Sequence, residues 1–151
     1  MTFATIDKRV IGIALRFRDS AGFLALGIVY AWFGILKVLG ISPTSPLVLA
    51  LLDKTMPGIS PDTFMLAFGA FETVIGLLFL FPVAVRLVVA LMAAHMAMTV
   101  LPLALLPGMT WTGPFVPTLE GQYILKNLVL LALALTMVAA TPPLAEGKSR
   151  T

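Results

Sequence analysis

The sequence of 151 residues contains no cysteine. Disulfide bonds, thiolate catalysis and iron–sulfur ligation by this chain are therefore excluded, and any redox role must depend on a cofactor or a partner protein. Charged residues are also scarce, at 11% of the chain, against about 25% in an ordinary soluble domain. His95 is the only histidine, so the chain offers no closed set of zinc ligands and we expect no metal site.

Hydrophobic residues, in contrast, make up 60% of the chain, and the mean hydropathy is +1.05. Seven acidic and ten basic residues are too few to cover the surface of a water-soluble domain of this size. The net charge of +3 is not arranged as a basic stripe interleaved with aromatic residues, which argues against nucleic-acid binding. The composition predicts one integral membrane domain, with the lipid bilayer as its main partner.

Four stretches are long and apolar enough to cross a bilayer as helices, which takes about 20 residues. The predicted spans are residues 20–40, 63–81, 83–106 and 119–140. Pro102 is expected to bend or end the third span. The connection between the first two spans carries four prolines around a short apolar run, which predicts an interfacial turn of helix rather than a fifth crossing. The expected fold class is all-α, an integral membrane four-helix bundle.

The flanking segments set the expected orientation. Residues 1–19 mix apolar residues with four basic ones, which predicts an amphipathic segment on the membrane surface, and residues 141–151 form a polar C-terminal tail. A cleaved signal peptide is the competing interpretation, but the apolar run is too long and no small-residue cleavage site follows it. Basic residues mark cytoplasmic flanks, and seven of the ten fall on one side of a four-span arrangement. Both termini, and a tight hairpin at Pro82, are therefore expected in the cytoplasm.

A few polar side chains interrupt the spans. At about 1.5 Å per helical residue, Glu72 lies roughly 15 Å deep in the second span and His95 about 14 Å deep in the third. Because side chains lean toward the N-terminus of their own helix, we expect Glu72 to pair with Lys37 or Lys126, with His95 bordering the site. The complete candidate site, in the outer half of the bundle, consists of Lys37, Glu72, His95, Tyr123, Lys126 and Asn127.

Each of these residues also has a purely structural interpretation. A buried pair at Glu72 would fix which helix faces meet, and lysines near a helix end reach the interface by snorkelling. His95 and Asn127 would serve as hydrogen-bonded residues between helices. Tyr30 is expected to pack or to contact lipid, although it shares a helix face with Lys37. In either case an ionised carboxylate alone in hydrocarbon costs about 2.5–3.5 kcal/mol, so Glu72 should face the interior and be paired or protonated.

Three motifs give the chain a family resemblance. They are the Phe-Gly-x-x-Lys that ends at Lys37, the Glu-x-x-x-Gly of Glu72 and Gly76, and the Tyr-x-Leu-Lys-Asn from Tyr123 to Asn127. The sequence from about residue 10 to 140 resembles the DoxX and DoxD-like family of small bacterial membrane proteins. The resemblance implies a left-handed four-helix bundle in the bacterial cytoplasmic membrane. Some members are subunits of a thiosulfate:quinone oxidoreductase, others join membrane-bound oxidative-stress assemblies, and many have no assigned activity.

The expected function is that of a membrane subunit of a quinone-linked redox or oxidative-stress assembly, with a partner protein. No intrinsic cofactor is expected; a quinone would bind in the polar site, where its carbonyls need donors in an apolar slot. The main alternative is a non-catalytic membrane scaffold or assembly factor, in which the buried charges only lock the bundle. A transporter for protons or a small solute is a lesser alternative, because no inverted repeat is visible and four short helices leave little room unless the chain forms an oligomer.

Overall fold

The computed structural model describes residues 2–81 and 84–142, so the predictions for the Pro82 hairpin and for most of the C-terminal tail lie outside the described residues. The described elements are α1 (Phe3–Val38), α2 (Ser45–Thr55), α3 (Pro61–Leu80), α4 (Val85–Val100), α5 (Pro102–Leu105), α6 (Pro107–Thr110), β1 (Trp111–Gly113), β2 (Val116–Pro117) and α7 (Leu119–Ala139). Among these described residues, four helical segments are long and apolar enough to cross a membrane: Ser20–Val38, Pro61–Leu80, Val85–Leu105 and Leu119–Ala139. Their number is the number of spans that the sequence predicts, and each predicted end lies within two residues of the end of the corresponding segment.

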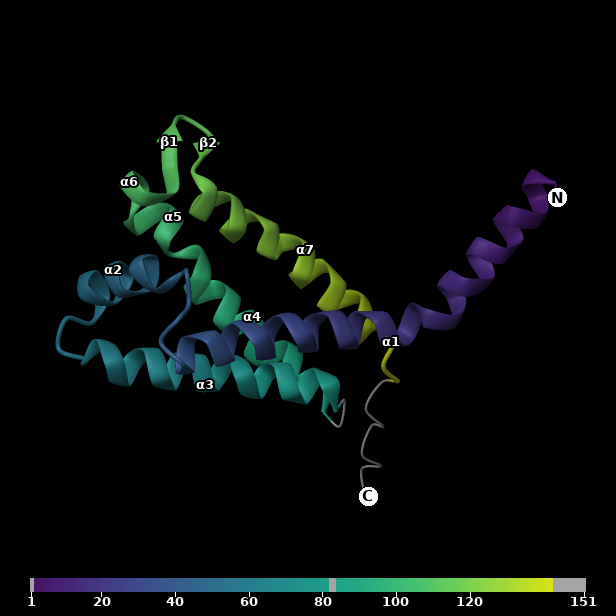
Figure 1. Ribbon diagram of the computed structural model, residues 1–151, viewed down its shortest axis with the longest axis horizontal. Coiled ribbons are helices and arrows are strands. Elements are labelled where there is room, and N and C mark those ends of the chain that lie inside the picture. Colours follow the sequence, from purple (N-terminus) through teal and green to yellow (C-terminus); the bar gives the residue numbers. More distant parts are fainter. Residues whose placement is uncertain (1, 82–83, 143–151) are drawn as a thin grey trace, which may run out of the picture.

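The first span is the second half of a much longer helix. α1 is continuous over 36 residues, and its first half, called here the N-terminal arm (residues 3–18), projects away from the bundle (Figure 1). At its other end, the Gly40 N–H donates to the Lys37 carbonyl at 3.1 Å and the Ile41 N–H to the Leu36 carbonyl at 3.0 Å. Gly40 has a φ of +71°, which glycine adopts without steric cost, so this motif ends the helix slightly earlier than predicted.

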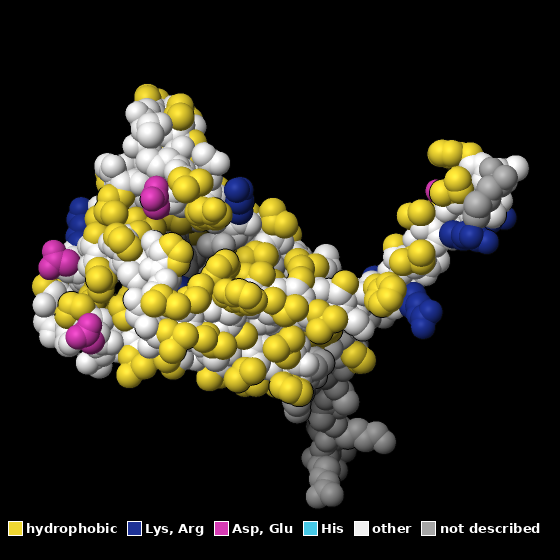
Figure 2. Space-filling view, viewed as in Figure 1, with side chains coloured by type: hydrophobic (Ala, Val, Ile, Leu, Met, Phe, Trp, Pro, Cys, Tyr) yellow, Lys and Arg dark blue, Asp and Glu magenta, His cyan; other side chains and the backbone are white. Residues whose placement is uncertain are grey.

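The four spans form a ring of neighbours in which α1 packs along α3, α3 contacts α4, α4 contacts α7 and α7 returns to α1. α1 and α3 run side by side for most of the length of the span (Figure 1). The buried core between the helices includes Leu26, Tyr30, Ile75, Phe79, Val88, Met92 and Ala134. Figure 2 shows apolar side chains over the middle of the visible face, with acidic and basic ones near one end and on the N-terminal arm. This distribution suits a helical domain surrounded by hydrocarbon.

The connections at the α2 end are more structured than the sequence predicts. α2 has 11 residues, too few to cross a bilayer, in agreement with the interfacial helix expected there. α4 gives way at Leu101 to the short α5, which starts at Pro102, because proline cannot donate the next helical hydrogen bond. The segment of residues 107–118, whose prolines and glycines are typical of an irregular loop, contains α6 and the antiparallel pair β1–β2.

Side-chain hydrogen bonds hold this small hairpin against the bundle. Thr110 is fully buried, and its hydroxyl contacts the Leu106 carbonyl at 3.1 Å. The indole N–H of Trp111 donates to the Leu103 carbonyl at 2.9 Å. Phe115, at the turn, has a φ of 60° and is 95% exposed. The hairpin is therefore an ordered cap at the start of α7, with an aromatic side chain at its tip.

Candidate functional site

The site is centred on Glu72, in the middle of α3. One oxygen, Oε2, accepts a hydrogen bond from Lys37 Nζ of α1 at 2.5 Å, and the other, Oε1, lies 2.8 Å from His95 Nε2 of α4. A single carboxylate thus joins three of the four spans. Only 5% of Glu72, 6% of Lys37 and 5% of His95 is exposed, so the pair is removed from solvent and from lipid.

Tyr30 of α1 extends this network by one residue. Its hydroxyl lies 3.4 Å from His95 Nδ1, on the opposite side of the imidazole ring from Glu72. A neutral imidazole with its proton on Nε2 satisfies both contacts, since Nε2–H donates to the carboxylate and Nδ1 accepts from the phenol. We assign this tautomer from the hydrogen-bond partners. The charges of Lys37 and Glu72 then cancel, as a buried site in a low-dielectric medium requires.

Aromatic rings cover the network. Phe68 of α3 stacks on His95, with ring centroids 5.2 Å apart and an interplanar angle of 21°. The Lys37 ammonium lies 5.5 Å from the centroid of the same ring, within range of a cation–π interaction. Phe64 stacks on Phe68 in turn, at 5.6 Å. These rings exclude water from the ion pair, which strengthens its electrostatic attraction.

Two glycines bring the backbones of α1 and α3 close enough for the pair to form. Gly34 lies one turn before Lys37, and Gly69 one turn before Glu72. A Cβ atom at Gly34 would lie 2.5 Å from the Thr73 backbone nitrogen, and one at Gly69 would lie 2.7 Å from the Gly34 carbonyl oxygen. No side chain fits there, so the two helices touch through their backbones, as in membrane helix pairs with small residues at the interface.

The structure brings together only part of the predicted site. Lys37, Glu72 and His95 meet, whereas Lys126 and Tyr123 are exposed on α7, with the Lys126 ammonium 5.1 Å from the Tyr123 ring centroid. Of the two predicted partners for Glu72, the structure places Lys37 beside it and not Lys126. Lys126 instead extends outward along its helix, as a snorkelling lysine does. Tyr30 was expected to pack or to contact lipid, with the alternative that it lines the same cavity as Lys37. The signal for that alternative is its position two turns before Lys37 on one helix face.

Asn127 belongs to a separate polar contact. Its amide Nδ2 donates to the Thr99 hydroxyl of α4 at 3.5 Å, and the Thr99 hydroxyl donates to the Met96 carbonyl at 2.9 Å. This contact lies in a shallow groove between α4 and α7, whose lining is otherwise apolar. The lining residues are Met96, Val100, Ile124, Asn127, Leu128 and Leu131. The groove is therefore small and almost wholly apolar, and one of its walls is α4, the helix that carries His95.

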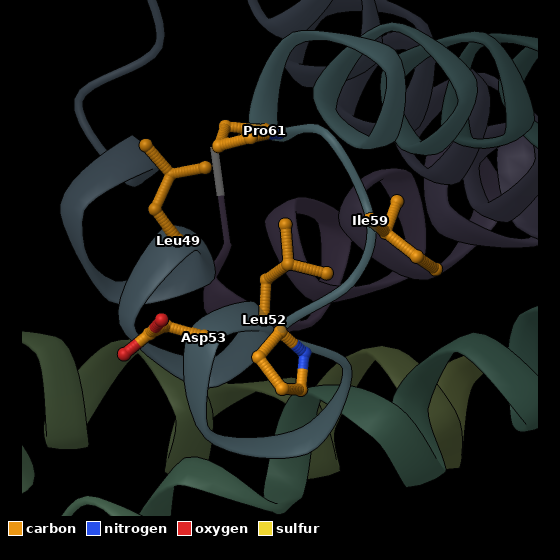
Figure 3. Close-up of a pocket in the computed structure, with 6 residues that line it drawn as sticks. Leu49, Leu52, Asp53, Ile59 and Pro61 are labelled. Carbon is orange, nitrogen blue, oxygen red and sulfur yellow. The ribbon is translucent and has the colours of Figure 1, made fainter.

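A second hollow lies beside α2, away from the network. Figure 3 shows Leu52 pointing into the space bounded by Ile59 and Pro61, while the carboxylate of Asp53 points the other way. Its lining contains no member of the Tyr30–His95–Glu72–Lys37 network. Among the described residues, no three His, Asp or Glu side chains are grouped closely enough to hold a metal ion.

The four apolar helices are those of a helical multi-pass membrane protein, and in the described part of the chain they enclose a charged, hydrogen-bonded site. Comparisons with protein-family models, with curated proteins and with solved structures found no match. The network and the α4–α7 groove are therefore the features of the molecule from which a function can be inferred.

Proposed function

We propose that the chain is a DoxX-like multi-pass subunit of the bacterial cytoplasmic membrane that binds a quinone for a redox or oxidative-stress assembly. Both termini would lie in the cytoplasm. The observation that supports the proposal is the small apolar groove of about 40 Å³ between α4 and α7, in which Asn127 is the one polar residue of the described lining. A quinone needs this combination, because its ring is apolar while its carbonyl oxygens accept hydrogen bonds. Electrons would come from a partner, since the chain has no cysteine to carry them.

Asn127 is the donor best placed for a ligand in this groove. Both ring nitrogens of His95 already have partners, and Lys126 and Tyr123 lie exposed on α7. Asn127 donates one amide hydrogen to Thr99, and the amide has a second hydrogen that a quinone carbonyl could accept. In this proposal the network at Glu72 does not contact the quinone. It fixes α4 relative to α1 and α3 and so sets the position of one wall of the groove.

The first test is a titration of the purified protein with a short-chain ubiquinone or menaquinone analogue. Asn127→Leu should weaken binding about tenfold, the effect of losing one hydrogen bond of about 1.4 kcal/mol. Gln122→Leu is the matched control, because Gln122 is an exposed amide residue of the same helix outside the groove lining. Saturable binding that both variants leave unchanged would remove the groove as the site, and absence of saturable binding would contradict the quinone proposal itself.

A scaffold function is the second candidate, and one observation favours it. All four network residues have partners, and none of them lines the α4–α7 groove or the α2 hollow. Such a closed network is what a purely structural lock requires. On this proposal, Glu72→Gln lowers the stability of the protein. In a strain that lacks the whole protein, a partner protein is lost from the membrane, while no quinone-dependent activity changes. Purification in mild detergent with no stoichiometric partner would count against it.

A further inference from the structure

The N-terminal arm presents two chemically different sides. Its side chains are exposed throughout the described positions, including 87% of Phe3 and 60% of both Val10 and Ile13. At about 100° per residue, five of the seven large apolar residues of the arm fall on a stripe about 80° wide. The stripe consists of Phe3, Ile6, Val10, Ile13 and Phe17, and the other two, Ile11 and Leu15, lie outside it on the same side as Lys8. Lys8, Arg9 and Arg16 mark a basic side, with Lys8 opposite the stripe and the two arginines along one of its flanks, so the arm is a basic helix with one mainly apolar side.

The position of the arm determines which medium meets this stripe. The first span begins at Ser20, directly after the arm, so the arm starts at the level where the hydrocarbon ends. In Figure 1 the helix changes direction near this junction, and the arm leaves the bundle at an angle to the span. An exposed stripe of five large apolar side chains at this level lies within reach of the bilayer surface.

The geometry points to an arm that lies on the bilayer and binds anionic lipid headgroups through its basic side. The apolar stripe would enter the boundary of the acyl chains, while the lysine and arginine side chains extend past it to lipid phosphates. Residues 1–19 contain four basic and two acidic residues. This net positive charge attracts an anionic lipid surface and repels a second arm, which favours lipid over a second copy as the occupant. The inference does not depend on the proposed quinone site.

Single-cysteine variants of the full chain test this arrangement, because the natural sequence has no cysteine to remove. Val10→Cys places a spin label on the stripe, and Gly12→Cys places one on the basic side, where an added Cβ meets nothing within 4 Å. Both proteins are placed in nanodiscs of phosphatidylcholine, with or without phosphatidylglycerol. Collision with oxygen reports burial in lipid, and collision with a water-soluble nickel complex reports exposure to water.

In anionic nanodiscs, the label at position 10 should collide mainly with oxygen and the label at position 12 mainly with nickel. In phosphatidylcholine alone, or with Lys8, Arg9 and Arg16 all changed to Gln, this contrast should shrink, because each charge near the surface is worth about fivefold in binding. Equal nickel access at both positions in anionic nanodiscs would place the arm in water and overturn the inference. Strong dipolar coupling between labels at position 10 of two chains would also overturn it, in favour of a second copy.

Discussion

Glu72 is the residue on which the interior of this protein depends. A carboxylate near the middle of a span is tolerated when its charge is balanced and its lone pairs are occupied. Lys37 supplies the balancing charge on one oxygen, and the His95 N–H supplies a donor for the other. These two contacts join the three helices α1, α3 and α4, so a group that is costly in hydrocarbon specifies which helix faces meet.

Loss of the carboxylate should therefore be far more damaging than loss of the whole ion pair. Glu72→Leu leaves the Lys37 ammonium buried without a counter-charge, and we expect a loss of about 3–5 kcal/mol in the free energy of unfolding. The double variant Lys37→Met, Glu72→Leu removes both charges and should recover most of that loss. Unfolding by SDS titration in detergent, followed by circular dichroism, measures each variant.

Tyr30→Phe provides the comparison within the network. It removes only the 3.4 Å contact with His95 and should cost about 1 kcal/mol or less. The double variant is also compared with Glu72→Leu alone and Lys37→Met alone. If its loss of stability equals the sum of those two losses, Lys37 and Glu72 do not interact energetically, and the network does not lock the helices together.

How far the site could be predicted depended on the helix. Glu72 and Lys37 were expected to be partners because the lean of their side chains makes them converge, and the structure places them 2.5 Å apart. Lys126 had the same chemistry at a similar depth, but depth does not determine how far a helix is rotated about its axis. On α7 that rotation turns Lys126 and Tyr123 outward, and a weakly amphipathic helix carries little sequence information about it.

Among the elements, α1 and α3 form the most closely packed pair, and glycine makes that contact possible. Two of the three atoms nearest to a Cβ at Gly34 are backbone atoms of α3, which cannot move aside by a change of rotamer. Small residues spaced four apart, such as Gly69 and Thr73, favour such close approach in general but do not identify the partner helix. The hairpin of residues 111–117 was not predicted at all, because its prolines and glycines are typical of irregular loops.

Alanine at two glycines of the same helix should have opposite consequences. Gly34→Ala forces α1 and α3 apart and should cost about 1–3 kcal/mol in the free energy of unfolding. Gly12→Ala lies in the N-terminal arm, where an added Cβ has nothing within 4 Å, and should only raise helix propensity, by up to about 1 kcal/mol. The SDS midpoint of the bundle measures both, and an unchanged midpoint for Gly34→Ala would show that the helices can separate without cost.

The whole molecule has two dissimilar ends. At one end, the Arg86 guanidinium at the start of α4 donates a hydrogen bond to the Pro142 carbonyl beyond α7, and the arm with its basic residues leaves the bundle on this side. At the other end, α2 carries Asp53 and Lys54, and α7 begins after the small hairpin with Glu120 in its first turn. Positively charged flanks are retained in the cytoplasm during insertion, so this asymmetry predicts a single orientation in the membrane.

Cysteine labelling in cells that express the protein tests that orientation with two equivalent positions. Gly12 lies in the arm and Gly58 in the connection between α2 and α3, and at both an added Cβ meets nothing within 4 Å. With the arm in the cytoplasm, a membrane-impermeant maleimide should label Gly58→Cys in intact spheroplasts and Gly12→Cys only after the membrane is broken. The reverse pattern would show that the arm lies outside the cytoplasm, opposite to the prediction. Equal labelling of both positions in intact spheroplasts would show that the two ends lie on the same side of the membrane. Because an even number of spans returns the chain to its starting side, a third label at Thr141→Cys should behave like the one at position 12 if all four helices cross.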